Sequence, residues 1–340
     1  MADQSTMRAW QLTGPGNILQ TLQLAQDVPR PRADELQQGQ ILVKVVSTGI
    51  NPADYKVPEL GVVARAVYRF PMTPGMDLAG LVEATGPGVE GVGKNDKIMA
   101  RMDPRSNWGP LAEYVVLEAG TWVPCAGVDM DEAAGTLTTA LTAYQCFKPY
   151  VKEGDKVFIN GGGGGLGTAG IQIAKLMGCH VTVSCSTGKI DFCKGLGADE
   201  VIDYKKEDVT AELVRRGADK VVIMDNVGNS PTDLYRRCDK ILTEAGAYVF
   251  IGGRISPGSV VNMASSLLRP GWLGGQRRKF VAAVTRTVEE DARQIAEWMS
   301  EGKYKTLVDS TFAFEEAKEA FERLKTDQCR GKVIVRVASQ

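Results

Sequence analysis

The chain has 340 residues, with 40 Lys and Arg against 41 Asp and Glu, seven cysteines and one histidine. Hydrophobic residues at 44% and charged residues at 24% exclude wholesale disorder, and at roughly 150 residues per domain the length predicts about two domains. A formal net charge of −1 gives no general attraction to nucleic acid or to anionic membranes. No stretch approaches the ~20 apolar residues that span a bilayer.

The counts of histidine and cysteine limit the metal and redox chemistry. A single histidine, His180, excludes sites built on two or more histidines. The cysteines are odd in number, scattered, and nowhere in Cys-x-x-Cys spacing, which argues against a disulfide framework or a four-cysteine zinc lobe. Together with an N-terminus that lacks a signal-peptide pattern, this predicts reduced thiols in the cytoplasm.

The first part of the chain reads as a compact β domain. The runs 41–46 and 112–116 are short and rich in β-branched residues, and turn formers such as Asn51-Pro52 and Pro74-Gly75 lie between them. Near residue 129 the pattern changes, because a helix is predicted from Asp131 toward Tyr150, with Asp129 or Asp131 as its N-cap.

Apolar strands and helical stretches then alternate. The predicted strands are 157–159, 180–184, 201–202, 221–224 and 247–251, and the predicted helices between them are 168–177, 189–196, 208–216 and 233–242. This alternation predicts an α/β domain with a doubly wound parallel sheet. From about Thr285 two amphipathic helices, 288–300 and 315–325, lead to a last strand, 332–337.

The strongest local signal is the glycine run 161–165 with Gly167. It follows a predicted buried strand and opens a helix, which is where a dinucleotide-binding loop needs glycine. We assign Gly162 to the tight turn, Gly164 to the approach of a pyrophosphate, and Gly167 to close packing of helix on strand. The free N–H groups of the helix N-terminus would meet the phosphates. The plain alternative is a flexible loop.

The residues after the next strand indicate which dinucleotide is bound. A carboxylate about 20 residues beyond the glycines usually holds the ribose 2′-OH of NAD. Here Ser184, Cys185 and Ser186 occupy that stretch and Lys189 follows. Hydroxyls and a cation suit a 2′-phosphate, which favours NADPH over NADH. The alternative for Lys189 is a solvated lysine at the start of a helix.

Several motifs together resemble the medium-chain dehydrogenase/reductase superfamily, over nearly the whole chain. The matching segments are 49–56, 74–80, 111–114, 133–134 with 141–143, the glycine run, 196–199 with 203–204, and 331–335. Within the superfamily they resemble the zinc-independent quinone oxidoreductase and enoyl reductase branch. Zinc alcohol dehydrogenases carry Gly-His-Glu where this chain has Gly75-Met76-Asp77, so the resemblance implies a site without zinc.

The resemblance implies a GroES-like β-rich catalytic domain, residues 1–127 completed by 276–340, and a Rossmann coenzyme domain, residues 128–275, with the reaction in the cleft between them. It carries over the coenzyme-binding positions as three sets. Gly161, Gly164, Gly165, Leu166 and Gly167 match the pyrophosphate loop; Ser186, Lys189 and Tyr204 match the 2′-phosphate positions; Thr142, Asn226, Ile251 and Gly252 match positions near the nicotinamide.

A site without zinc favours conjugated acceptors. Hydride addition to a simple ketone builds an alkoxide that needs a Lewis acid or a strong proton donor. Addition to an enone, an enoyl thioester or a quinone spreads the charge, and ordinary hydrogen-bond donors can stabilise it. By resemblance to trans-acting enoyl reductases, Lys56 is the cation near the developing enolate and Tyr55 a weaker proton-donor candidate. The alternatives are a solvated lysine, a packed tyrosine and, for Asn51, a purely structural turn residue.

The predicted partners follow from the same reading. They are a small conjugated carbonyl or quinone substrate, with no nucleic acid and no membrane. Relatives include homodimers and monomers, and a carrier protein would present an enoyl thioester. Loops 58–71 and 101–108 would determine the substrate. The rival hypotheses are a dinucleotide-binding protein with a structural or non-redox role and, almost excluded, a zinc alcohol dehydrogenase.

Overall fold

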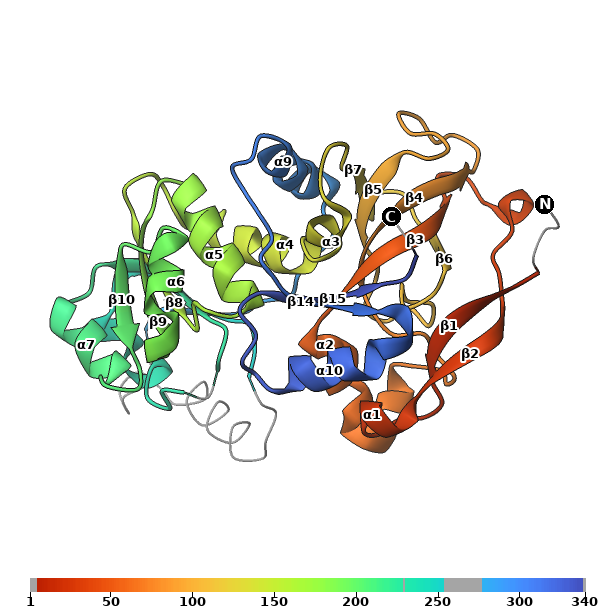
Figure 1. Cartoon of the computed structure of the whole chain (residues 1–340). Helices are drawn as coiled ribbons and strands as arrows, with labels where there is room; N and C mark the ends of the chain where they lie inside the picture. The colour runs from red at the N-terminus through yellow and green to blue at the C-terminus, as the bar shows by residue number, and fades with distance from the viewer. Residues whose placement is uncertain (1–4, 229, 254–276, 339–340) are drawn as a thin grey trace. The chain divides into compact units, whose positions relative to one another are not determined.

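The structure is a computed structural model that describes residues 5–228, 230–253 and 277–338 (Figure 1). The chain forms two compact units. The first unit comprises Met1–Leu141 and Thr287–Gln340, and the second comprises Thr142–Arg286. Both boundaries between the units lie later in the chain than the predicted boundaries, which follow residues 127 and 275. Residue 275 lies outside the described residues. The first boundary is later because α3 (Met130–Ala134) packs on strands of the first unit.

The first unit is built on a sheet in the order β14-β15-β3-β4-β5-β7, with β6 pairing β3 and a separate ribbon of β1 and β2. Its strands are β1 (Thr6–Leu12), β2 (Leu22–Pro29), β3 (Ile41–Ile50), β4 (Asp77–Thr85), β5 (Lys97–Arg101), β6 (Tyr114–Leu117), β7 (Trp122–Pro124), β14 (Val308–Ala313) and β15 (Lys332–Arg336). Its α-helices are α1 (Ile18–Thr21), α2 (Pro52–Lys56), α3, α9 (Glu289–Ser300) and α10 (Ala317–Lys325).

Burial of β3 explains why it lies in the middle of this sheet. All its residues except Lys44 are buried, and it pairs with β15, β4 and β6. The first unit's core contains its Ile41 and Val43 together with Phe321 of α10, a helix that lies along β14 and β15 (Figure 1). The C-terminal segment is thus an integral part of the first unit.

The second unit is a parallel sheet in the order β10-β9-β8-β11-β12-β13. Its strands are β8 (Lys156–Asn160), β9 (His180–Cys185), β10 (Glu200–Asp203), β11 (Lys220–Asp225), β12 (Leu242–Phe250) and β13 (Lys279–Ala282). Its α-helices are α5 (Gly165–Leu176), α6 (Ile190–Gly195) and α7 (Val209–Arg216). The chain order reverses between β8 and β11, which is the switch point at which doubly wound sheets bind ligands.

The helices agree with the sequence expectations except in two places. The single helix predicted from Asp131 toward Tyr150 is divided into α3, which ends before Gly135, and a further helix, α4 (Leu137–Phe147). Helix α4 runs from the first unit into the second, and Asp129 caps α3 by accepting hydrogen bonds from the backbone of Asp131 and Glu132. The predicted helix 233–242 is instead a 3₁₀ helix, Tyr235–Lys240, because Leu242 already pairs with Lys220 in the sheet.

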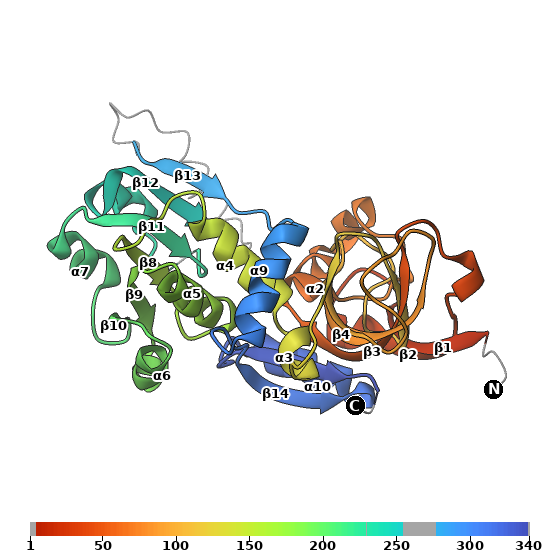
Figure 2. The same ribbon diagram turned by 90° about the horizontal axis from the view of Figure 1, so that it is seen from above.

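Helix α5 lies against β8 and β9 (Figure 2). The approach is close because a Cβ on Gly170 would stand 3.2 Å from Ile159 Cδ1 of β8. The predicted fold class, a GroES-like β-rich domain with a Rossmann-type parallel sheet, is confirmed. None of the helices in the described ranges is long and apolar enough to cross a membrane.

Candidate functional site

The glycine loop lies at the C-terminal end of β8. Its tight turn is at Gly161, whose φ of +84° is a left-handed conformation that only glycine adopts without strain. The prediction that Gly162 makes this turn is wrong, since Gly162 has no positive φ. A Cβ on Gly162 would stand 2.8 Å from Val183 Cβ, so glycine is needed there to let the loop pass β9.

Gly164 and Gly167 differ in what surrounds them. Gly164 is the N-cap of α5, and nothing in the described structure lies within 4 Å of a Cβ built on it. That open space, beside the N–H groups of Gly165 and Leu166 in the first turn, fits an approaching pyrophosphate. A Cβ on Gly167 would stand only 2.2 Å from the backbone oxygen of Gly161, so Gly167 lets helix and loop pack.

Hydrogen bonds fasten the glycine loop to β9. The Gly161 N–H donates to Ser184 Oγ at 3.0 Å, and the Gly162 N–H donates to the Ser184 carbonyl at 2.8 Å. Ser184 Oγ in turn donates to Asn160 Oδ1 at 2.7 Å. The loop is therefore anchored by backbone and side-chain contacts although its own residues carry no side chains.

The predicted 2′-phosphate residues lie together at the carboxyl ends of β9 and β10. Ser186 precedes the 3₁₀ turn that follows β9, and Lys189 is the last residue of that turn. The Tyr204 N–H donates to the Cys185 carbonyl at 3.1 Å. Lys189 Nζ donates to the Gly163 carbonyl at 2.9 Å. This bond places the predicted phosphate cation on the glycine loop, so the structure brings two of the predicted sets together.

One carboxylate does lie near this edge of the sheet. Asp203 ends β10 and is buried, and it accepts hydrogen bonds from Thr187 Oγ1 at 2.6 Å and from the Lys205 N–H at 3.0 Å. The Thr187 hydroxyl, more than any other contact, lowers the pKa of Asp203. Its oxygens are thus engaged by the protein, and no carboxylate ends β9, the strand where NAD enzymes usually place one.

The predicted nicotinamide residues lie in the second unit at helix α4 and near the ends of β11 and β12. Thr142 shares a 2.5 Å hydrogen bond with Thr285, and the Ile251 N–H donates to the Asp225 carbonyl at 3.0 Å. Gly252 lies close to the backbone of Asn226: a Cβ built on Gly252 would stand 3.3 Å from the Asn226 carbonyl oxygen. The Asn226 amide is buried, and within the described part of the chain neither of its polar atoms has a partner. A buried orphan amide fits a ligand that supplies both a donor and an acceptor.

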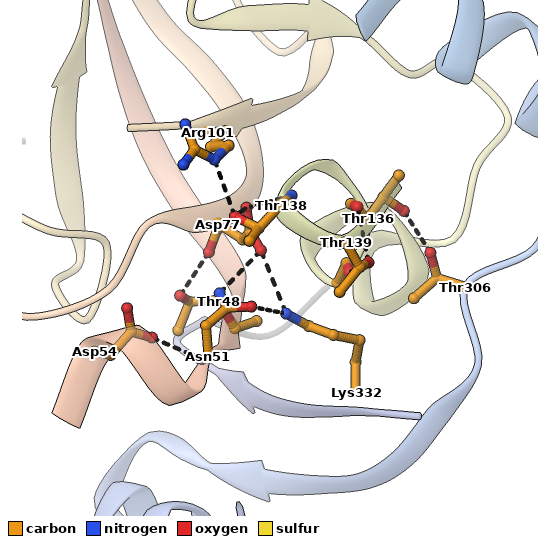
Figure 3. A network of polar contacts seen from close by, with 12 residues as sticks. Thr48, Asn51, Asp54, Asp77, Arg101, Thr136, Thr138, Thr139, Thr306 and Lys332 are labelled. Carbon is orange, nitrogen blue, oxygen red and sulfur yellow. Dashed lines mark hydrogen bonds and ion pairs between the residues drawn. The ribbon is translucent and has the colours of Figure 1, made fainter. Parts of the chain in front are cut away.

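A buried polar network lies in the first unit, centred on Asp77 (Figure 3). Asp77 Oδ1 accepts hydrogen bonds from Thr138, from the N–H at 3.0 Å and from Oγ1 at 2.7 Å. Asp77 Oδ2 accepts from Asn51 Nδ2 at 3.0 Å and pairs with Lys332 Nζ at 3.3 Å. Lys332 Nζ also donates to Asn51 Oδ1 at 2.6 Å. Asp77, Lys332 and Asn51 are all buried, so the three side chains close a ring of interactions away from water.

The predicted catalytic residues belong to α2, which begins at this network. Asn51 is the N-cap of α2, and its amide also donates to the Gly49 carbonyl at 3.1 Å. The Tyr55 ring is buried in the core of the first unit with Lys325 Nζ 5.1 Å from its centroid, which supports the packed alternative. Lys56 is half-buried and ends the helix.

Asp54 is the third polar residue of this helix. It is buried, and its Oδ2 accepts a hydrogen bond from the Asn51 N–H at 2.7 Å, as in a capping box. Burial is the main cause that raises the pKa of Asp54 to about 7, while the Asn51 hydrogen bond and the charge of Lys332 oppose the shift. Asp54 therefore exchanges a proton near neutral pH.

We expect Asp54 to make the free energy of unfolding fall as pH rises from about 4 to about 7. The folded state then binds a proton that the unfolded state, with an ordinary pKa near 4, has released, and the slope from this one group is at most about 1.4 kcal/mol per pH unit. Asp54→Asn should remove this slope, as measured by chemical denaturation at several pH values. The exposed Asp27→Asn is the control. An unchanged slope in Asp54→Asn would contradict the assignment.

The donor set for zinc does not fit this chain. In the position of the Gly-His-Glu motif, Met76 is a buried apolar side chain and Asp77 is fully engaged. His180 lies on β9 of the second unit. The cysteines are buried thiols, and within the described residues no group of three or more His, Cys, Asp or Glu side chains could hold a metal ion.

Lys332 is not among the residues predicted from the sequence, and Asp77 is predicted only as part of the segment 74–80. A signal was present for both. Lys332 opens a strand that continues with three apolar residues, and Asp77 opens a strand that continues Leu78-Ala79-Gly80. A charged residue at the buried end of an apolar strand requires a partner of opposite charge.

Two family models match the chain. "Alcohol dehydrogenase GroES-like domain" matches residues 37–127, and "Zinc-binding dehydrogenase" matches residues 196–335. The first covers much of the first unit's sheet. The second runs from β10 into the C-terminal return. The zinc of its description finds no matching ligand set in the described residues.

Relatives align along almost the whole chain. A trans-enoyl reductase, pgmF, from Aspergillus terreus is 40% identical over 98% of this chain and 97% of its own length. An NADPH-dependent alkenal/one oxidoreductase of Arabidopsis thaliana chloroplasts is 28% identical over 97% of this chain and 79% of its own. Among solved structures, the quinone oxidoreductase from Coxiella burnetii has a TM-score of 0.81 at 28% identity, covering 98% of this chain and 99% of its own.

Proposed function

Because the chain belongs to the quinone oxidoreductase and enoyl reductase branch of the medium-chain dehydrogenase/reductase superfamily, we propose that it reduces conjugated acceptors with NADPH. The observation that carries the coenzyme proposal is the pairing of an open helix N-cap at Gly164 with Lys189 bonded to the same loop. The family binds a nicotinamide dinucleotide, and bound NADPH supplies a hydride. The relatives' printed activities, on enoyl, alkenal and quinone compounds, support the acceptor class.

Three sets of residues in the second unit bind three parts of NADPH. The N–H groups of Gly165 and Leu166 face the pyrophosphate, since they belong to the first turn of α5 and point out of its N-terminus. Lys189, Ser186 and Tyr204 hold the 2′-phosphate. Asp203 is compatible with this choice, because its oxygens already accept hydrogen bonds from Thr187 and Lys205 and are not free to accept one from a ribose hydroxyl. Thr142, Asn226, Ile251 and Gly252 hold the nicotinamide end.

Lys56 is the proposed cation for the acceptor's developing negative charge. An ammonium group within hydrogen-bonding distance of a carbonyl oxygen stabilises an enolate more than the neutral substrate, which lowers the barrier. Tyr55 is the weaker proton-donor candidate, given its burial. Two hydrogen bonds join the loops 58–71 and 101–108, which we propose determine the substrate. The Tyr68 hydroxyl donates to the Pro104 carbonyl at 2.9 Å, and Asn107 Nδ2 donates to the Arg69 carbonyl at 3.0 Å.

A screen of enals, enones, enoyl thioesters and quinones that follows NADPH absorbance tests the function. We expect turnover of at least one class. In Lys56→Ala, kcat should fall about a hundredfold or more, as for a lost donor to an oxyanion. Lys44→Ala, on an exposed position of β3, is the matched control. Tight NADPH binding without oxidation by any acceptor would instead favour the structural or non-redox role, and full activity in Lys56→Ala would remove that residue from the reaction.

The assembly and location are proposals as well. Seven buried thiols support a reducing compartment, the cytoplasm. A trans-enoyl reductase among the relatives supports an acceptor presented as a thioester on a carrier protein. A homodimer is the proposed assembly, which sedimentation of the pure protein would test.

A further inference from the structure

The Asp77–Lys332 pair is costly to bury, and it is joined to the start of α2 by hydrogen bonds to the N-cap residue Asn51. Asp77 is fully buried and Lys332 is 4% exposed. A buried ion pair of this kind gives little net stability compared with apolar residues of the same size, so its presence calls for another role. What distinguishes this pair is the group that it holds.

The pair engages the side chain of Asn51 from both ends. Lys332 Nζ donates to Oδ1 at 2.6 Å, Asp77 Oδ2 accepts from Nδ2 at 3.0 Å, and the second amide hydrogen goes to the Gly49 carbonyl at 3.1 Å. The amide plane is thereby fixed. The backbone of the same residue donates to Asp54 Oδ2 of α2 at 2.7 Å. Figure 3 shows this order of contacts, from Lys332 and Asp77 through Asn51 to Asp54.

Fixing Asn51 fixes the direction in which α2 leaves the sheet. α2 has five residues, and helices this short are not stable alone. Its orientation therefore depends on its N-cap and on packing of Tyr55. Lys56 is the last residue of the helix, one turn beyond Pro52. A rotation at the N-cap would move Lys56 directly.

We propose that Asp77 and Lys332 form a positioning pair that holds Asn51, and through it α2, so that Lys56 is presented to the acceptor. The proposal rests on the proposed function for the role of Lys56, and it assigns that reaction two positioning residues from β4 and β15. Neither side chain needs to touch the substrate. Asp77 has its Oδ1 saturated by Thr138 and its Oδ2 by Asn51 and Lys332.

The test replaces both charges at once, because a single substitution leaves one buried charge without its partner. Asp77→Asn with Lys332→Met keeps the side-chain sizes, removes both charges, and opens the ring by removing the donor to Asn51 Oδ1. The matched control is Asp131→Asn with Arg336→Met. That pair also joins a buried carboxylate to a cation on β15, with Arg336 Nη2 2.6 Å from Asp131 Oδ2, and it bonds to Ser47 rather than to Asn51.

Two readouts separate positioning from general destabilisation. Hydrogen exchange of a peptide spanning residues 50–57 should speed up about tenfold or more in the Asp77/Lys332 double variant and stay within twofold in the control. In the Asp77/Lys332 double variant, kcat should fall about tenfold while the Kd for NADPH stays unchanged. When the same two substitutions are added to Lys56→Ala, kcat should not fall further, because the pair acts on the reaction only through Lys56.

The outcomes are distinguishable. Unchanged exchange at 50–57, or a kcat loss that adds fully to that of Lys56→Ala, would overturn the positioning role. Absence of NADPH oxidation in the wild type, or full activity in Lys56→Ala, would overturn the proposed function instead, and the exchange measurement would then decide alone whether the pair holds α2. If the Asp77/Lys332 double variant does not fold, Asn51→Ser serves for the same measurements, because it keeps an N-cap oxygen and the ion pair itself but removes the amide that Asp77 and Lys332 hold.

Discussion

Replacing Lys189 by glutamate should weaken NADPH binding relative to NADH binding by a factor of about 100 to 1,000. A lost hydrogen bond between a cation and a phosphate, with a carboxylate added beside it, costs roughly 3–4 kcal/mol. NADH lacks the 2′-phosphate and does not meet this charge. Fluorescence titration of both coenzymes gives the ratio of the two Kd values, which is the quantity that tests the 2′-phosphate assignment.

The ratio of the two Kd values is also unaffected by a second consequence of the substitution, the loss of a bond to the glycine loop. Lys189 Nζ donates to the Gly163 carbonyl, so Lys189→Glu loosens the glycine loop for both coenzymes. Such loosening lowers both affinities equally and cancels in the ratio. Lys194→Glu, the same charge change at an exposed position of α6, controls for the long-range field. A ratio that shifts equally in both variants, or not at all, would refute Lys189 as the phosphate residue.

The spacing of apolar residues and of turn formers was enough to predict strands β8 to β12 of the second unit, whereas β13 was not predicted. Apolar runs followed by helical stretches indicated a parallel sheet, and the order 10-9-8-11-12-13 is the one such a chain adopts. The glycine run was located correctly, but the tight turn was assigned to Gly162 instead of Gly161. Consecutive glycines look alike in sequence. Only the backbone path distinguishes the one with φ of +84° from its neighbour.

The polar site of the first unit could be predicted only in part. Asn51, Tyr55 and Lys56 are contiguous, and a motif identified them. Lys332 lies far from Asn51 in the sequence and meets it only because β15 pairs with β3 at Val333 and Ile50. Sequence patterns fix local structure, whereas a contact of this kind depends on register across strands that are distant in the chain. The later division of the units has the same origin, in the packing of α3.

Substituting alanine at Gly167 should lower the melting temperature by roughly 5 to 10 °C and abolish measurable NADPH binding. The added Cβ would stand 2.2 Å from the Gly161 backbone oxygen and 2.6 Å from the Gly162 carbonyl carbon. Backbone atoms cannot turn aside as a side chain does, so either α5 moves away from β8 or the loop distorts. Overpacking of this kind costs about 1–3 kcal/mol, and either response moves the N–H groups that face the pyrophosphate.

Alanine at Gly164 separates the two roles of glycine in this loop. With nothing described within 4 Å and no positive φ, the added methyl group is accommodated by the free protein, and the melting temperature should stay within about 2 °C. The methyl group then stands in the space assigned to the pyrophosphate, so NADPH and NADH should both bind at least about tenfold more weakly, a loss of roughly 1.4 kcal/mol. Calorimetry and coenzyme titration on the two variants give the comparison. If Gly164→Ala binds NADPH as the wild type does, the pyrophosphate does not approach α5 at its N-cap. If the melting temperature of Gly164→Ala instead falls as far as that of Gly167→Ala, the space around Gly164 is not open, and that part of the site description is contradicted.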